Sequence, residues 1–488
     1  MIEFKPAKNN EITATYNGLW LHSSYNPSKE AERFAESLQP AKSDRFIIII
    51  EPALSYCASF IKKRFPDKKT GAIRLVKDFS DYNGNFDFII DLSNEKKESF
   101  SEIIFNTLGE EKIYSTYFAD WEPSRKSFTE MHEECINAIK TCMEKSKTLL
   151  VTREYFEKKW FLNTLNFIKY TKNTVKLCKK IDRDILIIAS GPSLHENLNT
   201  IKTYRRNFFI IVLSSAISVC SKNNIIPDLC MSTDGGFWAG EHLKRMPEKS
   251  VLALSSESFC SRRILEKCNI LPMQYEDGLS RSILERADLK ELLKIKRNGT
   301  VSGTALDFAL DYGEKNIYFF GLDMAASKGF QHEQPNELEI NNSINDFKLN
   351  SLEKRSFKSE KSSASLNIYL QWFQNKKINN RKVFRVIAKA QNSLGDIKDI
   401  PPDNFSDYCK NMNSEREKSQ YFENNDFKVN MNKLSESSNQ IFSDKNMRQL
   451  FPLTSLSLEH NPDNEELKSR LNNERAELKK KLEELNRD

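Results

Sequence analysis

The chain has 488 residues, which exceeds the size that a single hydrophobic core usually supports, so we expect two or three domains. Its 74 Lys and Arg residues are interspersed with 68 Asp and Glu residues, and no basic block carries interleaved aromatic residues, which argues against nucleic-acid binding. Nine scattered Cys residues without a CxxC pair, and the lack of an apolar leader or a run of about 18 apolar residues, predict a soluble, cytoplasmic protein with reduced thiols.

The first part of the chain, residues 1–125, predicts a small α/β domain. Its expected elements, in order, are a strand at 46–50, a helix at 55–65 and strands at 73–76 and 86–90. Residues 126–182 are predicted to be mainly helical and to form a bridge into the next domain.

Residues 183–402 predict a larger α/β domain, because strands alternate with helices along it. Six apolar runs predict its strands: Ile185–Ala189, Phe208–Leu213, Leu229–Thr233, Val251–Leu254, Ile317–Phe320 and Val383–Ile387. This alternation is typical of a doubly wound, Rossmann-like parallel sheet, in which ligands bind where the strands end.

Two later segments depart from this pattern. The stretch from about 326 to 365 is rich in Ser, Asn, Lys and Glu and follows a strand end, and we interpret it as a lid over the site rather than as filler. Residues 403–488 are very polar and predict a helical, partly flexible C-terminal region. Its last helix, 465–485, carries Leu residues at helical spacing and packs either on its own domain or on a partner.

The first candidate for a nucleotide site is the turn Ser190-Gly191-Pro192-Ser193, which directly follows the first strand of the larger domain. Gly191 allows the backbone to approach a ligand, and Pro192 suits the first turn of a helix. Ser193 can either cap that helix or donate to a phosphate oxygen, which the N–H groups of a helix N-terminus also bind. A plain capped helix start fits the same four residues, so both interpretations stay open.

A second candidate phosphate loop opens the helix that precedes the fifth predicted strand. It consists of small and hydroxyl residues: Gly299, Thr300, Ser302, Gly303 and Thr304. Their amides and hydroxyls are expected to face the crevice, and the alternative is an ordinary Ser/Thr-capped helix. The strand that follows ends in Gly321 and Asp323.

Polar residues also follow the second and third predicted strands. Ser214 and Ser215 follow one, and Asp234 follows the other, where they suit recognition of a base, a ribose or a sugar. An Asp-Gly-Gly sequence is also a common turn, and Asp234 could bind a ribose hydroxyl, an acceptor or a metal. Because no DxD carboxylate pair follows any of these predicted strand ends, we predict no metal site.

His332 is the candidate general base, since it comes shortly after the strand end that carries Gly321 and Asp323. An imidazole titrates near working pH and could remove a proton from an attacking hydroxyl. The alternative is a solvated loop histidine.

Several of these motifs together resemble the motility-associated factor (Maf) family of flagellin glycosyltransferases, whose central domain is related to bacterial sialyltransferases. The resemblance covers roughly residues 15 to 400 and is strongest from 184 to 335. The segments that carry it are Leu21–Ala31, Gly191–Leu194, Asn298–Asp307, Ile317–Met324 and Gly329–His332.

The resemblance implies a cytoplasmic enzyme that transfers a nonulosonic acid, such as a pseudaminic or legionaminic acid, from a CMP-activated donor to Ser or Thr hydroxyls of flagellin. It implies no tightly bound cofactor, and Mg²⁺ is compatible with it but not required. His332 aligns with the His of the family's Gly-x-Thr-His stretch, and Asp323 would orient it or replace it as the base. The residues implied in donor binding are Ser190, Gly191, Pro192, Ser193, Ser214, Ser215, Asp234, Gly299, Thr300, Ser302, Gly303, Thr304 and Gly321. Transfer is expected to invert the anomeric centre, with helix N-termini stabilising the leaving phosphate.

Departures from the family pattern leave the identity of the sugar open. Many relatives have Gln-Asp-Leu at Leu322–Met324 and Thr at Gln331, and the sialyltransferases have Asn where this chain has Ser214 and Asp234. Two alternatives remain. The same domain family also includes archaeal enzymes that transfer pyrophosphate from ATP to a hydroxymethylpterin, which share the Gly-Pro-Ser-Leu start but are single-domain proteins. A non-catalytic flagellin-binding module could keep the same fold.

Overall fold

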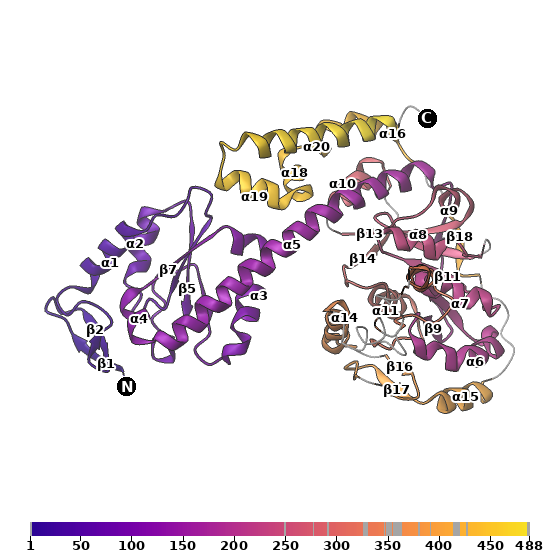
Figure 1. Cartoon of the computed structure of the whole chain (residues 1–488), viewed down its shortest axis with the longest axis horizontal. Helices are drawn as coiled ribbons and strands as arrows, with labels where there is room; N and C mark the ends of the chain where they lie inside the picture. Colours follow the sequence, from indigo (N-terminus) through magenta and orange to yellow (C-terminus); the bar gives the residue numbers. More distant parts are fainter. Residues whose placement is uncertain are drawn as a thin grey trace. The chain divides into compact units, whose positions relative to one another are not determined.

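The computed structural model describes residues 2–485 apart from 248–249, 277, 290–291, 326–329, 346, 348–353, 355–363, 379–380, 391, 413–419 and 426–427. The chain divides into two compact units, Met1–Glu157 with Phe442–Leu478, and Lys158–Ile441 with Lys479–Asp488. The 42-residue helix α5 (Thr129–Tyr170) contributes to both units (Figure 1).

The first unit contains a four-stranded parallel sheet in the order β6-β5-β4-β7. Its strands are β4 (Phe46–Ile50), β5 (Lys69–Arg74), β6 (Phe88–Asp91) and β7 (Thr116–Asp120), and the predicted α/β character is confirmed. The strand predicted at 73–76 was placed too late. Pairing with β4 begins at Lys69, opposite Phe46, whereas the amides of Leu75 and Val76 leave the sheet and donate to Glu51 Oε2 at 2.7 and 2.9 Å.

Three short strands before this sheet, and β7 at its edge, were not predicted. The former make an antiparallel sheet of β1 (Ile2–Pro6), β2 (Ile12–Tyr16) and β3 (Leu19–Trp20). The helices of the unit are α1 (Pro27–Ser37), α2 (Cys57–Arg64), α3 (Phe100–Tyr114), α4 (Glu122–Ser127), the first part of α5, α18 (Asp444–Leu450), α19 (Pro452–His460) and most of α20 (Glu465–Glu484).

The N-terminal motif Leu21–Ala31 holds two loops of this unit together through buried hydrogen bonds. His22 is buried, and its Nε2 accepts a hydrogen bond from the backbone N–H of Leu54 at 3.1 Å. Trp121 Nε1 donates to the carbonyl of Leu21 at 2.9 Å, so the motif ties the loop after β4 to the end of β7. Asn26 caps α1 by accepting from the N–H of Lys29. Burial lowers the pKa of His22, although Glu30 beside it acts in the opposite direction.

The second unit is built on an 11-stranded sheet whose main path runs β17-β16-β15-β9-β10-β11-β12-β13-β8-β18, with β14 paired to β13. Its strands are β8 (Asn173–Leu177), β9 (Ile185–Ile188), β10 (Phe209–Leu213), β11 (Leu229–Ser232), β12 (Val251–Ser255), β13 (Asn269–Tyr275), β14 (Leu293–Ile295), β15 (Ile317–Phe320), β16 (Val383–Val386), β17 (Lys398–Ile400) and β18 (Phe422–Asn425). Their pairing is parallel except for β18, which runs antiparallel to β8. All six strands predicted for this region are present.

Sequence reasoning missed four of these strands and misassigned one more segment. The strands β13, β14, β17 and β18 were not predicted, and β8 falls in the stretch expected to be helical. The residues of β8 gain their strand conformation from pairing with β13 on one side and β18 on the other. Such pairing is decided by the sheet and not by local apolar spacing.

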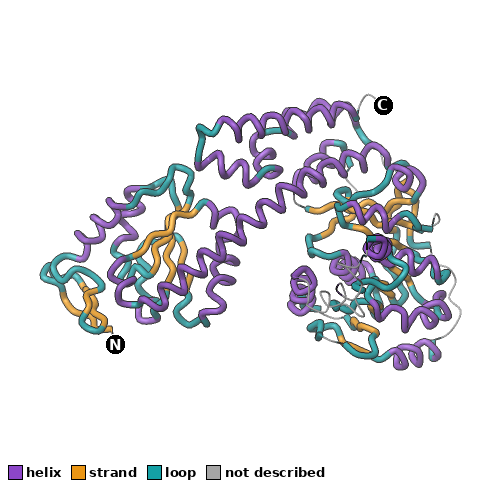
Figure 2. The backbone as a smooth tube through the Cα atoms, viewed as in Figure 1, coloured by secondary structure: helices purple, strands orange, loops and turns teal. Residues whose placement is uncertain are grey.

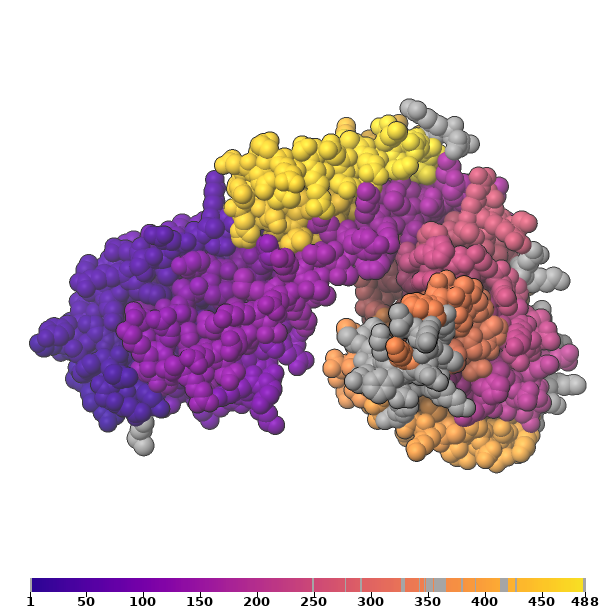
Figure 3. Space-filling model, in the orientation of Figure 1, coloured from indigo at the N-terminus to yellow at the C-terminus, as the bar shows by residue number. Residues whose placement is uncertain are grey.

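Helices flank the strands of the second unit (Figure 2). They are α6 (Leu198–Thr203), α7 (Ile217–Lys222), α8 (Phe237–Leu243), α9 (Arg262–Lys267), α10 (Gly278–Arg286), α11 (Val301–Tyr312), α12 (Glu337–Ile344), α14 (Ala364–Asn375), α15 (Pro402–Lys410), α16 (Met431–Glu436) and α17 (Ser438–Ile441), with the short 3-10 segments η3 (Pro192–Asn197), η4 (Arg205–Asn207) and η5 (Ser214–Ala216). The last turn of α20 also belongs here, and Lys481 and Glu484 line one groove with Leu162 and Leu165 of α5 (yellow on magenta in Figure 3).

Two expectations about helices need correction. The helix predicted after Ser193 begins as the 3-10 segment η3, and the α-helical turns start only at Leu198. The stretch interpreted as a polar lid carries α12 and the start of α14, so it is partly helical, while its residues 326–329, 346, 348–353 and 355–363 lie outside the described residues.

The order of strands places a topological switch point between β9 and β15. From β9 the chain moves to β10 on one side, and from β15 it moves to β16 on the other. In open parallel sheets, ligands bind in the crevice at such a point, beyond the carboxyl ends of the strands. The turn Ser190–Ser193 and the pair Gly321 and Asp323 lie at these two strand ends.

Candidate functional site at the ends of two strands

The ends of β9 and β15 approach each other so closely that two glycines are required. Gly191 N–H donates to the carbonyl of Gly321 at 2.8 Å. A Cβ on Gly191 would lie 2.5 Å from that same carbonyl oxygen, and one on Gly321, whose φ is +64°, would clash with the carbonyl of Ala189. These glycines therefore serve the contact between the two strand ends, whatever ligand the crevice takes.

Asp323 is bound through both of its carboxylate oxygens to Ser193. The backbone N–H of Ser193 donates to Oδ2 at 2.7 Å, and its hydroxyl donates to Oδ1. Burial raises the pKa of Asp323, and the hydrogen bonds from Ser193 and the charge of Arg385 act in the opposite direction. The sequence pattern predicted that the amide at the start of η3 could bind a phosphate. In the structure this amide donates to the carboxylate of Asp323.

Ser190 and Ser215 connect the ends of β9 and β10. Their hydroxyls lie 2.8 Å apart, and the carbonyl of Ser190 accepts the N–H of Glu333 at 2.6 Å. Asn336 Nδ2 donates to the carbonyl of Ser215 at 3.0 Å, whereas Ser214 is buried in η5. The loop that follows β15 is therefore attached to the carboxyl edge of the sheet.

The helix α12 is attached to the same edge by a second cluster. Glu337 Oε1 accepts the hydroxyl of Ser218 from α7, and Glu337 Oε2 lies 3.0 Å from His242 Nδ1 of α8. Burial raises the pKa of Glu337, but the bonds from His242 and Ser218 outweigh it and hold the pKa below its usual value. We call Ser218, His242 and Glu337 the α12 clasp.

Glu333 and His195 form an ion pair at this site that sequence reasoning did not identify. Glu333 Oε1 lies 3.3 Å from His195 Nδ1, and the Glu333 side chain is 16% exposed. Burial raises the pKa of Glu333 and the negative charge of Asp323 adds to it, while His195 opposes the shift. The available signals were that His195 lies two residues after Ser193 of the Gly-Pro-Ser turn and that Glu333 is adjacent to His332.

The side chain of His332 faces Glu339, whereas the family resemblance implied that Asp323 would orient it. Its Nδ1 lies 3.6 Å from Glu339 Oε1, and the same oxygen accepts the N–H of Gln331 at 3.0 Å. The His332 side chain is 23% exposed, and Glu339 is buried. The assignment of His332 as a base stays a prediction.

The second predicted phosphate loop forms a capped helix start. Thr300 is the N-cap of α11 and accepts from the N–H of Ser302 at 3.3 Å, and Gly299 adopts a φ of +71°. The side chains of Ser302 and Thr304 are buried, and a Cβ on Gly303 would lie 3.0 Å from the ring of Trp372 in α14. These residues are therefore packed, and their expected part in donor binding stays a prediction.

Asp234 forms a local turn at the end of β11. Its Oδ1 accepts the N–H of Gly236 at 2.9 Å, and the residue is exposed. Burial raises the pKa of Tyr369 in α14, and the negative charge of Asp234 adds to that shift. The contacts thus join Ser190, Gly191, Ser193, Ser215, Gly321 and Asp323 into one cluster, with Pro192 opening η3 beside it. Gly303 packs against Trp372 of α14, and the side chain of Asp234 accepts from its own turn.

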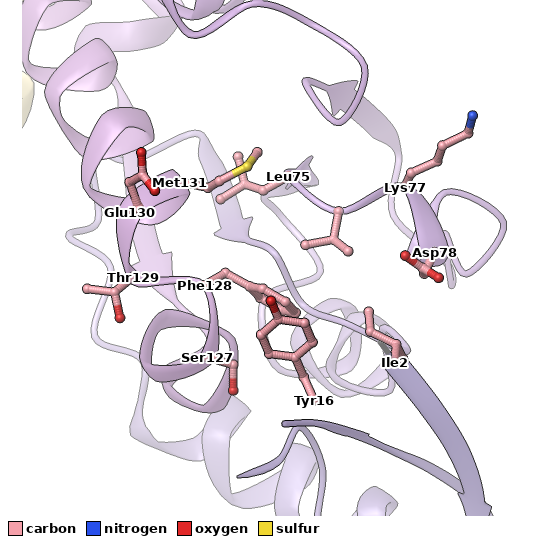
Figure 4. A pocket seen from close by; sticks show the side chains of 11 residues that line it. Ile2, Tyr16, Leu75, Lys77, Asp78, Ser127, Phe128, Thr129, Glu130 and Met131 are labelled. Carbon is pink, nitrogen blue, oxygen red and sulfur yellow. The ribbon is translucent and has the colours of Figure 1, made fainter. Parts of the chain in front are cut away.

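The first unit contains a separate pocket of about 610 Å³ at the end of β5, shown in Figure 4. The rings of Tyr16 and Phe128, 4.7 Å apart, form part of its lining together with Leu75 and Met131. None of the predicted site residues lines it. Within the described part of the chain, no group of three or more His, Cys, Asp or Glu side chains could hold a metal ion, and no helix is long and apolar enough to cross a membrane.

Comparison with known proteins identifies the central part of the chain. Residues 158–329 match the family model described as 6-hydroxymethylpterin diphosphokinase MptE-like. This segment of the second unit is therefore similar to the MptE-like family. The predicted resemblance is thereby confirmed for the segment that holds Ser190–Ser193, Thr300–Thr304 and Asp323.

Two similar proteins come from Treponema pallidum (strain Nichols), and both are described as uncharacterized. One is 30% identical over 242 residues, which is 50% of this chain and 53% of the relative. The other is 23% identical over 125 residues, which is 25% of this chain and 60% of the relative. The matches thus span little more than half the length of these relatives.

The fold is also similar to that of a Maf glycosyltransferase from Magnetospirillum magneticum AMB-1. The similarity covers 100% of this chain and 90% of that one, with a TM-score of 0.54 and 10% sequence identity. At this level of identity the similarity concerns the arrangement of elements, which is mixed α/β with parallel sheets.

Proposed function

We propose that this protein is a cytoplasmic glycosyltransferase that moves a nonulosonic sugar from a CMP-activated donor to Ser or Thr hydroxyls of flagellin. The observation that carries the proposal is the cluster of Ser193, Asp323 and Glu333 at the switch point of the MptE-like domain. Its support from outside the site is the similarity in fold to a Maf glycosyltransferase over the whole chain.

The proposed reaction is a single inverting displacement. The acceptor oxygen attacks the anomeric carbon, the bond from that carbon to the phosphate oxygen breaks, and CMP leaves with the electron pair. The acceptor proton passes to a base of the protein. The protein lowers the barrier mainly by positioning donor and acceptor and by stabilising the charge on the leaving phosphate.

The N-terminus of α11 is the better placed of the two helix starts for the leaving phosphate. The amide at Ser193 already donates to Asp323, whose carboxylate takes the position that an anion would occupy. The 12-residue helix α11 begins at the same carboxyl edge, with Thr300 as its cap. Its dipole favours negative charge there.

The test is calorimetric titration of the purified full chain with CMP, and separately with ATP and Mg²⁺, followed by mass spectrometry of flagellin incubated with a CMP-activated nonulosonic acid. We expect CMP to bind, Ser302→Ala to weaken that binding, and flagellin to gain the mass of the sugar. Absence of both CMP binding and transfer would contradict the proposal. Flagellin binding without nucleotide binding would instead indicate a non-catalytic module.

A second candidate function is pyrophosphate transfer from ATP to a hydroxymethylpterin. It is favoured by the description of the matching family model, which names a 6-hydroxymethylpterin diphosphokinase. It predicts binding of ATP with Mg²⁺ and no binding of CMP, so the same titration separates the two functions.

A further inference from the structure

Three ionisable side chains at the switch point could accept a proton, and their contacts distinguish them. Asp323 is fully engaged, because Ser193 donates to each of its two oxygens. Moving a proton to Asp323 would weaken both of these hydrogen bonds and loosen the start of η3. Asp323 is therefore suited to hold the turn and not to act as a base.

His332 is directed to the side of α12. Its Nδ1 faces the buried carboxylate of Glu339 at 3.6 Å, and that oxygen also fixes the amide of Gln331. These contacts attach the loop after β15 to α12, so they do not direct His332 toward Asp323.

Glu333 lies beside the end of β9. Its backbone N–H donates to the carbonyl of Ser190 at 2.6 Å, which fixes the residue beside the end of β9. The negative charge of Asp323 adds to the raised pKa of Glu333, and the Glu333 side chain is 16% exposed, so an acceptor hydroxyl can reach its carboxylate. His195, whose side chain is 77% exposed, lies 3.3 Å from Oε1 on the solvent side.

We propose that Glu333, positioned by His195 and by the carbonyl of Ser190, is the group that takes the proton from the acceptor hydroxyl. The inference rests on the proposed function and specifies its base. As the oxygen–carbon bond forms and CMP leaves with the electron pair, the hydroxyl proton moves to a Glu333 carboxylate oxygen, and it is released to water after the product departs.

The local electrostatics suit this role. Burial and Asp323 raise the pKa of Glu333 above that of an exposed glutamate, which makes the carboxylate a stronger base, while His195 keeps the ionised form accessible. Glu333 must be ionised to act, so turnover falls as the pH drops through its raised pKa. Replacing His195 removes the opposing influence and moves this acidic limb to higher pH.

The test measures CMP release from a CMP-activated nonulosonic acid in the presence of flagellin, over a range of pH. We expect Glu333→Gln to lower kcat by about 10²- to 10³-fold, in the range of general-base contributions, with little change in the KM for the donor. The matched control is Glu196→Gln, an exposed glutamate on η3, which we expect to behave as wild type. His195→Gln should keep measurable turnover and shift the acidic limb upward.

Chemical rescue separates a base from a structural residue. Glu333→Ala should regain part of its turnover when formate is added, because a small carboxylate can take the vacated position, whereas His332→Ala should not respond. Wild-type transfer combined with a fully active Glu333→Gln variant, or formate rescue at His332 alone, would overturn the inference and leave the proposed function standing. Absence of transfer by the wild-type protein, with no CMP binding, would overturn both.

Discussion

Ser193 and Asp323, 130 positions apart in the sequence, share two hydrogen bonds at the meeting point of β9 and β15. One runs from the backbone N–H of Ser193 at 2.7 Å and the other from its hydroxyl. The pair connects the two strand ends between which the crevice of a doubly wound sheet opens.

The titration of Asp323 gives a first prediction. Since burial raises its pKa in the folded chain, the folded state binds this proton more tightly than the unfolded state does. The stability that follows is fully present below the unfolded pKa and is lost as the pH rises through the folded pKa. Asp323→Asn removes this titration, so the free energy of unfolding of the variant should improve relative to wild type as the pH rises from the unfolded value of about 3.9 through the raised pKa of the folded state. Urea unfolding at several pH values measures it. The exposed Asp403→Asn should show no such trend, and a constant difference for Asp323→Asn would contradict the prediction.

The two glycines with left-handed backbone at the site should respond differently to alanine. Gly299 and Gly321 both have positive φ, but an added Cβ meets nothing within 4 Å at Gly299 and clashes with the carbonyl of Ala189 at Gly321. Gly299→Ala should lower the free energy of unfolding by about 1 kcal/mol, because alanine is disfavoured in the left-handed backbone conformation. Gly321→Ala adds the steric clash and should cost about 3 kcal/mol or more. Thermal and urea unfolding of the two variants measure these losses of stability. Equal losses for Gly299→Ala and Gly321→Ala would show that the ends of β9 and β15 can move apart.

The α12 clasp predicts a pH-dependent attachment of this helix. The pKa of Glu337 is held below its usual value, so its contribution to stability is present above the unfolded pKa and is lost as the pH falls through the folded pKa. Glu337→Gln should therefore lower the free energy of local opening of α12 by about 1 to 2 kcal/mol at neutral pH, which is measured as faster amide hydrogen exchange. The substitution should have less effect near pH 4.

A matched control for the clasp is Glu241→Gln, which removes only a surface pair with Lys244 on α8. Exposed pairs of this kind contribute less than about 1 kcal/mol. Equal exchange rates in α12 for the two variants at neutral pH would mean that the clasp does not hold the helix.

The buried hydrogen bond of His22 predicts how the stability of the first unit depends on pH. His22→Phe leaves the buried N–H of Leu54 without its acceptor, so we expect a loss of about 1 to 3 kcal/mol at pH 8. Because burial lowers the pKa of His22, wild-type stability from this group falls as the pH drops below the unfolded value of about 6.5. The difference between variant and wild type should thus shrink at pH 5. Tyr25→Phe, in the same motif but 62% exposed, should change stability by less than about 0.5 kcal/mol.

The sequence by itself determined the class of fold and the segments that carry the site. Runs such as Ile185–Ile188 and Ile317–Phe320 are apolar on both faces, which only strands covered on two sides tolerate, and their turn residues mark where each strand ends. The motif at Ser190–Ser193 and the helix cap at Thr300 follow from local backbone chemistry, so they could be placed without the structure.

Only the tertiary structure decided which of these residues meet. The neighbours of a parallel strand are not its neighbours in the chain, so the contact of Ser193 with Asp323 depends on β15 lying beside β9. The same arrangement brings Glu333 to His195 and turns His332 toward Glu339, although Glu333 and His332 are adjacent in sequence. Hydrogen bonds across the sheet, and the burial that shifts the pKa values of the carboxylates, arise only when distant segments pack together.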